Sequence, residues 1–293
     1  MMSYSRYPFL MITLIRLLVG GLVVYLILCV FMVLYQDRLL FLRRELPEER
    51  LRALQDSPFE VEEISLATPE GITLHGWWVN REQAGLRNET GGGKVPVVFF
   101  FGGNAEEVSH MAWEGSNHPD WSFVLVNYRG YGRSEGSPEE EALLQDSLLI
   151  YDYAAQRDTL DPERTVVMGR SLGTGVAAYL ASQREISAAL LISPYDSMVQ
   201  VAQDAYPFLP VNRLMRHRFE VLPHARQVDI PLYAIIALRD EVIAVKRSQA
   251  LLESWGGEVF LTEVPHAGHN TLAATAAYDR FLEESLGEIH SSE

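Results

Sequence analysis

The chain contains a single cysteine, Cys29, and it lies in an apolar stretch near the N-terminus. One cysteine forms no disulfide within its own chain, so a disulfide-stapled fold and a cysteine-based zinc site are both excluded. Most of the histidines are scattered and lack the short spacings of metal-binding motifs. We therefore expect neither a metal nor a cofactor.

Positive charge is also scarce. The chain has 24 Lys and Arg against 39 Asp and Glu, a formal net charge of −15. Such a balance argues against a nucleic-acid partner, because the phosphate backbone is itself anionic. Residues 1–40 hold three Arg and one Asp, so the acidic excess lies in the rest of the chain. An acidic body is repelled by an anionic bilayer surface.

Charge is absent altogether from Leu17 to Tyr35, and the apolar stretch extends back to residue 9 across Arg16. The uncharged part alone reaches about 28 Å as a helix, close to the hydrocarbon thickness of a bilayer. A signal peptide is the nearest alternative, but the stretch is too long and no small-residue cleavage site follows it. We expect residues 1–40 to be a single-pass anchor that spans the membrane at about 9–35, physically separate from the body it tethers.

Arginines flank the expected span unequally. Two precede the uncharged stretch, and five follow it within about 20 residues. The five that follow are Arg38, Arg43, Arg44, Arg50 and Arg52. By the positive-inside rule, the larger domain faces the cytoplasm.

After a linker at 41–60, apolar strands and helices alternate along the chain. We expect strands at 61–67, 72–79, 95–101, 122–126, 165–168, 188–192, 231–238 and 258–264. Strands separated by helices indicate right-handed crossovers, and hence an α/β fold with a mostly parallel sheet covered on both faces. The domain is expected over 61–287, followed by a tail at 288–293. Residues 195–229 interrupt the alternation with three prolines and several aromatics, which indicates a cap over the sheet.

The most informative motif is Gly-x-Ser-x-Gly at 169–173, between a buried strand and an Ala-rich helix. A serine on so tight a turn adopts a strained backbone, tolerable only beside residues without a Cβ. The turn holds the Ser171 hydroxyl at a helix N-terminus, where partial positive charge favours an anionic intermediate. Ser171 is therefore a candidate nucleophile.

Ligands of parallel sheets bind outside the carboxyl ends of the strands, so partners of Ser171 should follow later strands. Asp240 and His269 do so, in the order Ser, Asp, His. An imidazole takes the proton of the serine, and the carboxylate orients that imidazole. Two alternatives stay open: Asp196, after an earlier strand, as the acid, and His266 as the base.

Five motifs resemble those of a known superfamily. They are Gly102-Gly103-Asn104-Ala105, Tyr128-Arg129-Gly130-Tyr131-Gly132-Arg133-Ser134-Glu135-Gly136, the serine motif, and Asp240-Glu241-Val242-Ile243-Ala244 with Ala267-Gly268-His269-Asn270. Over roughly residues 58–287 the chain resembles the α/β-hydrolase superfamily. Within it, the chain is similar to membrane-anchored serine hydrolases and to membrane-associated acyl-protein thioesterases. The resemblance implies the α/β-hydrolase fold and a Ser–His–Asp triad that forms an acyl-enzyme.

The resemblance also implies an oxyanion hole made of two backbone N–H groups. One comes from Leu172, and the other from Asn104, or from Gly103 if the loop is shifted by one residue. Gly102 replaces the His that braces this loop in the family, and Ile236-Ala237 replaces the His-Gly that often precedes the acid. Neither departure removes a catalytic group.

The expected cap supplies apolar side chains that could receive an acyl chain, among them Met198, Tyr206, Phe208 and Leu214. We therefore expect a membrane-anchored hydrolase of small-molecule or lipid-like acyl esters or thioesters. Two other functions stay open. The same triad cleaves amides, so the protein could be a peptidase, or it could be a tethered scaffold with a vestigial site. The oligomeric state is not indicated.

Overall fold

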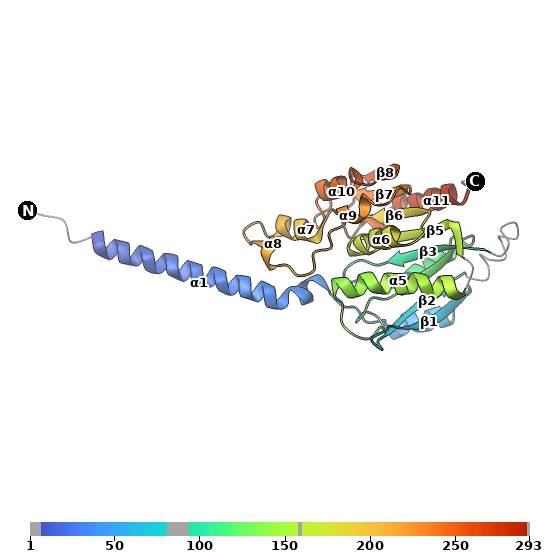
Figure 1. The fold of residues 1–293 in the computed structure, drawn as a ribbon, viewed down its shortest axis with the longest axis horizontal. Helices are drawn as coiled ribbons and strands as arrows, with labels where there is room; N and C mark the ends of the chain where they lie inside the picture. Colours follow the sequence, from blue (N-terminus) through green and yellow to red (C-terminus); the bar gives the residue numbers. More distant parts are fainter. Residues whose placement is uncertain (1–6, 81–93, 158–159, 292–293) are drawn as a thin grey trace, which may run out of the picture.

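The structure is a computed structural model, and it describes residues 7–80, 94–157 and 160–291 (Figure 1). Within these residues, eight strands form one sheet in the order β1-β2-β4-β3-β5-β6-β7-β8. Their bounds are β1 Val61–Ala67, β2 Thr73–Val79, β3 Val95–Phe101, β4 Ser122–Val126, β5 Leu160–Arg170, β6 Ala188–Ile192, β7 Leu232–Ala237 and β8 Val259–Val264. β2 pairs antiparallel with β1 and β4, and the strands from β3 to β8 are parallel. The expected mostly parallel sheet is confirmed.

Helices cover both faces of the sheet, as continuous apolar strands require. One face packs against α5 (Glu140–Arg157), α6 (Leu172–Gln183) and α10 (Val245–Leu252). The other face packs against α2 (Glu48–Gln55), α4 (Met111–Ser116) with the short η2 (Val108–His110), and α11 (Ala276–Ser291), which follows η3 (Leu272–Ala274). The core therefore consists of two apolar layers, one on each side of the sheet.

The cap consists of three short helices between β6 and β7: α7 (Met198–Ala205), α8 (Val211–Leu214) and α9 (Leu222–Ala225). In Figure 1, α7 and α8 lie at the end of the body that faces α1 (Tyr7–Leu40).

Two of the expected boundaries differ. Helix α11 continues through Ser291 because Ile289 is buried against the sheet, so most of the expected tail at 288–293 belongs to the domain. The expected linker at 41–60 contains α2 and packs on the domain, since Phe41 and Leu54 are both buried in the core.

Among the residues that the structure describes, one helix is long and apolar enough to cross a membrane, Leu10–Leu40, and its most apolar window of 18 residues has a mean hydropathy of 3.0. The described side chains before Cys29 are exposed on every side of the helix. From Cys29 onward one stripe is half-buried at helical spacing. The stripe consists of Cys29, Met32, Val33, Gln36, Asp37 and Leu40.

The stripe contacts the cap, so the expectation that the anchor is physically separate is wrong. Cys29 and Met32 pack against a small apolar cluster in the cap formed by Val199, Leu209 and Val211. Polar contacts continue along the same face. Gln36 donates from Nε2 to the Leu214 carbonyl at 3.2 Å and accepts from the Arg216 N–H at 2.7 Å. Asp37 accepts from Arg216 through both carboxylate oxygens, each at 2.9 Å.

Candidate active site

Ser171 stands alone between the end of β5 and the start of α6, with φ 50° and ψ −118°. This is a left-handed backbone that a serine adopts only under strain. The neighbouring glycines permit it, because a Cβ on Gly169 would lie 2.6 Å from the Gly173 carbonyl oxygen and one on Gly173 would overlap the Phe101 carbonyl. The Ser171 N–H donates to the Ile192 carbonyl at 2.9 Å, which fixes the turn to the next strand.

Three side chains from separate strand ends meet at this turn. His269 Nε2 lies 3.0 Å from Ser171 Oγ, and His269 Nδ1 lies 2.7 Å from Asp240 Oδ2. Ser171 follows β5 directly, Asp240 follows β7, and His269 follows β8. All three groups are nearly buried, so bulk water competes little with their contacts. The arrangement suits transfer of the serine proton to the imidazole.

The two oxygens of Asp240 have separate partners. Oδ1 accepts from the N–H groups of Val242 and Ile243 at 2.9 and 2.7 Å, which leaves Oδ2 for His269. Burial of the carboxyl raises its pKa, but the hydrogen bonds from His269 and the two backbone groups outweigh burial and lower the pKa below 3.8. Asp240 is therefore a carboxylate at neutral pH, fixed by its own loop before it meets His269.

The alternatives do not reach the serine. Asp196 is buried, but its Oδ2 lies 3.1 Å from Arg247 Nη1 and its Oδ1 accepts from the Ser197 N–H at 2.7 Å. His266 is exposed. The structure brings together the three residues expected from the sequence and not these two.

The loop after β3 lies against the serine, since a Cβ on Gly103 would stand 3.4 Å from Ser171 Cβ. The Gly103 N–H already donates to Glu106 Oε2 at 2.5 Å. Within the part of the chain that the structure describes, the N–H groups of Asn104 and Leu172 have no hydrogen-bond acceptor. These two are therefore available as oxyanion donors, and Gly103 is the weaker candidate.

Sequence reasoning missed Glu106. Its buried carboxylate accepts from Gly103, and its Oε1 lies 3.2 Å from Arg170 Nη1 and 3.1 Å from His110 Nε2. Burial raises the pKa of Glu106, but the hydrogen bond from His110 and the charge of Arg170 outweigh burial and lower the pKa below 4.5.

Glu106 thus holds the loop in which Gly102 stands where the resembling family has His. Tyr128 assists by donating from its hydroxyl to the Gly102 carbonyl at 2.9 Å. The available signal was an acidic residue two positions after Asn104 together with an Arg directly before the serine. Glu106 and Arg170 come close together because β3 pairs with β5, and this pairing could not be predicted from the sequence alone.

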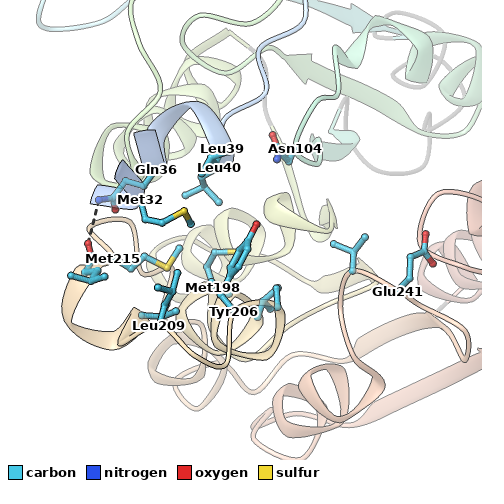
Figure 2. Close-up of a pocket in the computed structure, with 16 residues that line it drawn as sticks. Met32, Gln36, Leu39, Leu40, Asn104, Met198, Tyr206, Leu209, Met215 and Glu241 are labelled. Atoms are coloured by element: carbon cyan, nitrogen blue, oxygen red, sulfur yellow. Dashed lines mark hydrogen bonds between the residues drawn. The ribbon is translucent and has the colours of Figure 1, made fainter. Parts of the chain in front are cut away.

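A cavity of about 380 Å³ lies between the cap, α1 and the loops that carry Asn104 and Glu241 (Figure 2). Of the expected substrate residues, Met198, Tyr206 and Leu214 line it. Phe208 does not; its ring is 59% exposed on the outside of the cap. Phe208 lies in the turn between α7 and α8, and its contact with substrate stays a prediction.

Over the described residues, no group of three or more His, Cys, Asp or Glu is placed to hold a metal ion. At the carboxyl end of the sheet, the described residues thus bring together a serine hydroxyl, an imidazole, a carboxylate and two N–H groups that have no acceptor among these residues.

Comparison with known proteins gives consistent matches. A family model described as the α/β hydrolase fold matches residues 95–226. An uncharacterized protein of Mycobacterium tuberculosis is 30% identical over 210 residues, which cover 71% of this chain and 72% of that protein. The α/β hydrolase domain-containing protein WAV2 of Arabidopsis thaliana is 27% identical over 200 residues, 62% of each chain.

Solved structures show the same fold at lower identity. An α/β hydrolase from Vibrio vulnificus superposes with a TM-score of 0.68 at 22% identity, covering 88% of this chain and 92% of that one. The Pyrococcus furiosus esterase Pf2001 superposes with a TM-score of 0.60 at 20% identity, covering 81% and 94%.

Proposed function

The chain belongs to the α/β-hydrolase superfamily, and from that premise we propose that it is a membrane-anchored serine hydrolase that cleaves carboxylic ester or thioester bonds. The observation that carries the proposal is the continuous line of contacts from Asp240 through His269 to Ser171, at 2.7 and 3.0 Å. A scaffold without activity has no physical reason to keep a strained serine within reach of an oriented imidazole.

The reaction follows from the geometry. Ser171 Oγ attacks the carbonyl carbon of the ester while its proton passes to His269 Nε2. Asp240 accepts from Nδ1–H, so it holds the tautomer whose Nε2 is free and stabilises the imidazolium that forms. The C–O or C–S bond then breaks, His269 gives its proton to the leaving alcohol or thiol, and an acyl-enzyme remains. Water gives a proton to the same imidazole as it attacks the acyl carbon. The bond from that carbon to Ser171 Oγ then breaks, the carboxylic acid leaves, and His269 returns the proton to Oγ.

The negative charge that develops on the carbonyl oxygen is stabilised by the N–H groups of Asn104 and Leu172. The second lies at the N-terminus of α6, where the helix dipole adds to the effect. Removal of one such donor from a site of this kind costs roughly 3–4 kcal/mol of transition-state stabilisation.

Helix α1 is proposed as the single-pass anchor. It carries an uncharged apolar stretch of sufficient length, and its described side chains before Cys29 are exposed on all sides, as contact with lipid requires. The arginines that follow the span favour a cytoplasmic position for the hydrolase domain.

The test is Ser171→Ala in the full-length protein in detergent micelles. We expect loss of p-nitrophenyl acetate hydrolysis and of labelling by a fluorophosphonate, which reacts only with an activated serine, while the thermal unfolding midpoint stays within a few degrees of that of the wild type. Unchanged turnover in the variant would assign the nucleophile to another residue. A wild-type protein that is folded but neither labelled nor active would favour the scaffold, and faster cleavage of a matched amide would favour the peptidase.

A further inference from the structure

Part of the wall of the cavity beside the candidate catalytic residues is formed by the proposed membrane anchor. Four of its lining residues, Met32, Gln36, Leu39 and Leu40, belong to α1. Figure 2 shows them above the groove, facing Met198, Leu209 and Met215 of the cap, with Asn104 and Glu241 at the other end. The groove therefore runs from the anchor helix to the loops that carry the candidate oxyanion donor and the candidate acid.

The length of α1 fits this role. Its 34 residues extend about 51 Å, whereas the hydrocarbon core of a bilayer is ~30 Å thick. The helix is thus about 20 Å longer than the hydrocarbon core is thick. The half-buried stripe that begins at Cys29 has a similar length. Tyr25 donates from its hydroxyl to the Phe208 carbonyl at 3.1 Å, so the cap reaches the apolar part of the helix itself.

The anchor is also connected to the catalytic loop. The N–H of Leu42, two residues after α1 ends, donates to Asn104 Oδ1 at 2.8 Å. Asn104 lines the groove, and its backbone N–H is a candidate oxyanion donor. A displacement of α1 would therefore act on both the width of the groove and the position of an oxyanion donor.

We propose that α1 forms one wall of an acyl-chain site, and that the substrate is a single-chain lipid ester whose acyl chain passes from the bilayer into the groove between α1 and the cap. This inference rests on the proposed serine hydrolase function and names its substrate class. The site is incomplete without the anchor helix.

The lining supports this occupant. Most of the groove is aliphatic or thioether, and the amide of Gln36 is already bonded to Leu214 and Arg216, so it demands no polar ligand. A volume of about 380 Å³ is at the small end of ligand pockets, which fits one acyl chain better than two. Phe208 is exposed, and its backbone carbonyl accepts from the Tyr25 hydroxyl; two aromatic residues at this place suit the interface between lipid and water, where aromatic side chains gather.

The first test measures chain-length selectivity with p-nitrophenyl esters from acetate to palmitate, in the full chain in phosphatidylcholine nanodiscs. We expect kcat/KM of the wild type to rise about fourfold per methylene until the groove is full. Met32→Trp narrows the groove and should lower the decanoate-to-acetate ratio by about tenfold, and Met32→Ala should move the optimum to longer chains. Opposite shifts from one position cannot come from misfolding.

The matched control is Leu34→Trp, two residues away and 69% exposed outside the groove. It adds the same side chain to the same helix and should leave the profile unchanged. An identical effect of both tryptophans, or a flat profile in the wild type, would overturn the proposal. Preference for a palmitoyl-cysteine peptide over a monoacylglycerol of equal chain length would overturn the lipid as the source of the chain.

The second test reads binding without hydrolysis. A diazirine-bearing fatty acid in phosphatidylcholine vesicles should cross-link to the cap between Met198 and Met215 in both wild type and Ser171→Ala. Met32→Trp should reduce these cap adducts at least fivefold, and Leu34→Trp should not. Adducts confined to α1 would show that the chain does not enter the groove. Hydrolysis of esters by Ser171→Ala would contradict the proposed serine mechanism. Cap adducts that depend on Met32 would still support the acyl-chain site in that case.

Discussion

The catalytic group and the groove beside it are built in opposite ways. Ser171, Asp240 and His269 each follow a strand of one parallel sheet, so backbone hydrogen bonds determine where they lie. The groove is enclosed by segments far apart in the chain, joined by side-chain contacts such as the one between Gln36 and Leu214, 178 residues apart. The sheet thus fixes the positions of the three candidate catalytic residues, whereas the shape of the groove depends on side-chain contacts that single substitutions can alter.

The largest expected effect concerns the candidate catalytic residues that the sheet positions. Asp240→Asn should leave the His269 imidazole in the wrong tautomer and lower kcat by about 10⁴-fold. Asp196→Asn is the matched control, because Asp196 is an equally buried acid after a neighbouring strand but pairs with Arg247. It should change KM more than kcat. Steady-state kinetics with a short ester measure both. A large loss in kcat at Asp196 with near-normal turnover at Asp240 would reverse the assignment.

Glu106 belongs to the candidate active site, but like the groove it depends on side-chain contacts, through which it holds the candidate oxyanion loop. Glu106→Ala removes the acceptor of the Gly103 N–H and the partner of Arg170 and His110. We expect kcat to fall about 10–100-fold, the scale of hydrogen bonds to a charged group, with KM nearly constant because the oxyanion forms only in the transition state.

Glu106→Gln provides the control for this change. It keeps an acceptor for Gly103 and should restore part of kcat. If KM rises while kcat is unchanged in Glu106→Ala, the residue acts on substrate binding and does not position the oxyanion loop.

The smallest expected effect concerns the attachment of the cap. Asp204 in α7 accepts hydrogen bonds from Arg247 at 2.7 Å and from Lys246 at 2.8 Å, both in α10. These hydrogen bonds and charges outweigh the effect of burial and lower the pKa of Asp204 from 3.8 to about 2. Because the folded pKa lies below the unfolded one, the contact stabilises the fold above about pH 4 and is lost as the pH falls towards 2.

Thermal unfolding of wild type and Asp204→Asn between pH 7 and pH 2 measures this contribution. The difference in midpoint should be small and constant from pH 7 to about pH 5, then shrink below about pH 4 and vanish as the pH approaches 2. A difference that grows as the medium becomes more acidic would contradict the assignment.

The same contrast explains what the sequence could predict. The positions of the strands and the three candidate catalytic residues could be predicted from buried apolar runs and from motifs at their ends, which depend on local sequence, whereas the order of the strands in the sheet could not. The contact between α1 and the cap could not be predicted, because the apolar face of a membrane helix and one that packs on protein look alike in composition. The role of Glu106 was missed for a related reason, since its partners Arg170 and His110 lie on other segments of the chain.

The backbone of Ser171 has a consequence for the stability of the whole domain. A serine held at φ 50° raises the free energy of the folded state by roughly 1–3 kcal/mol relative to a relaxed conformation, a sizeable part of the 5–15 kcal/mol by which folded domains exceed their unfolded chains. The surrounding sheet must supply this amount through its own packing. A glycine at 171 would relieve this strain and make the domain more stable, but it would remove the hydroxyl. The strained serine is therefore tolerated only because the packing of the two apolar layers keeps the domain folded.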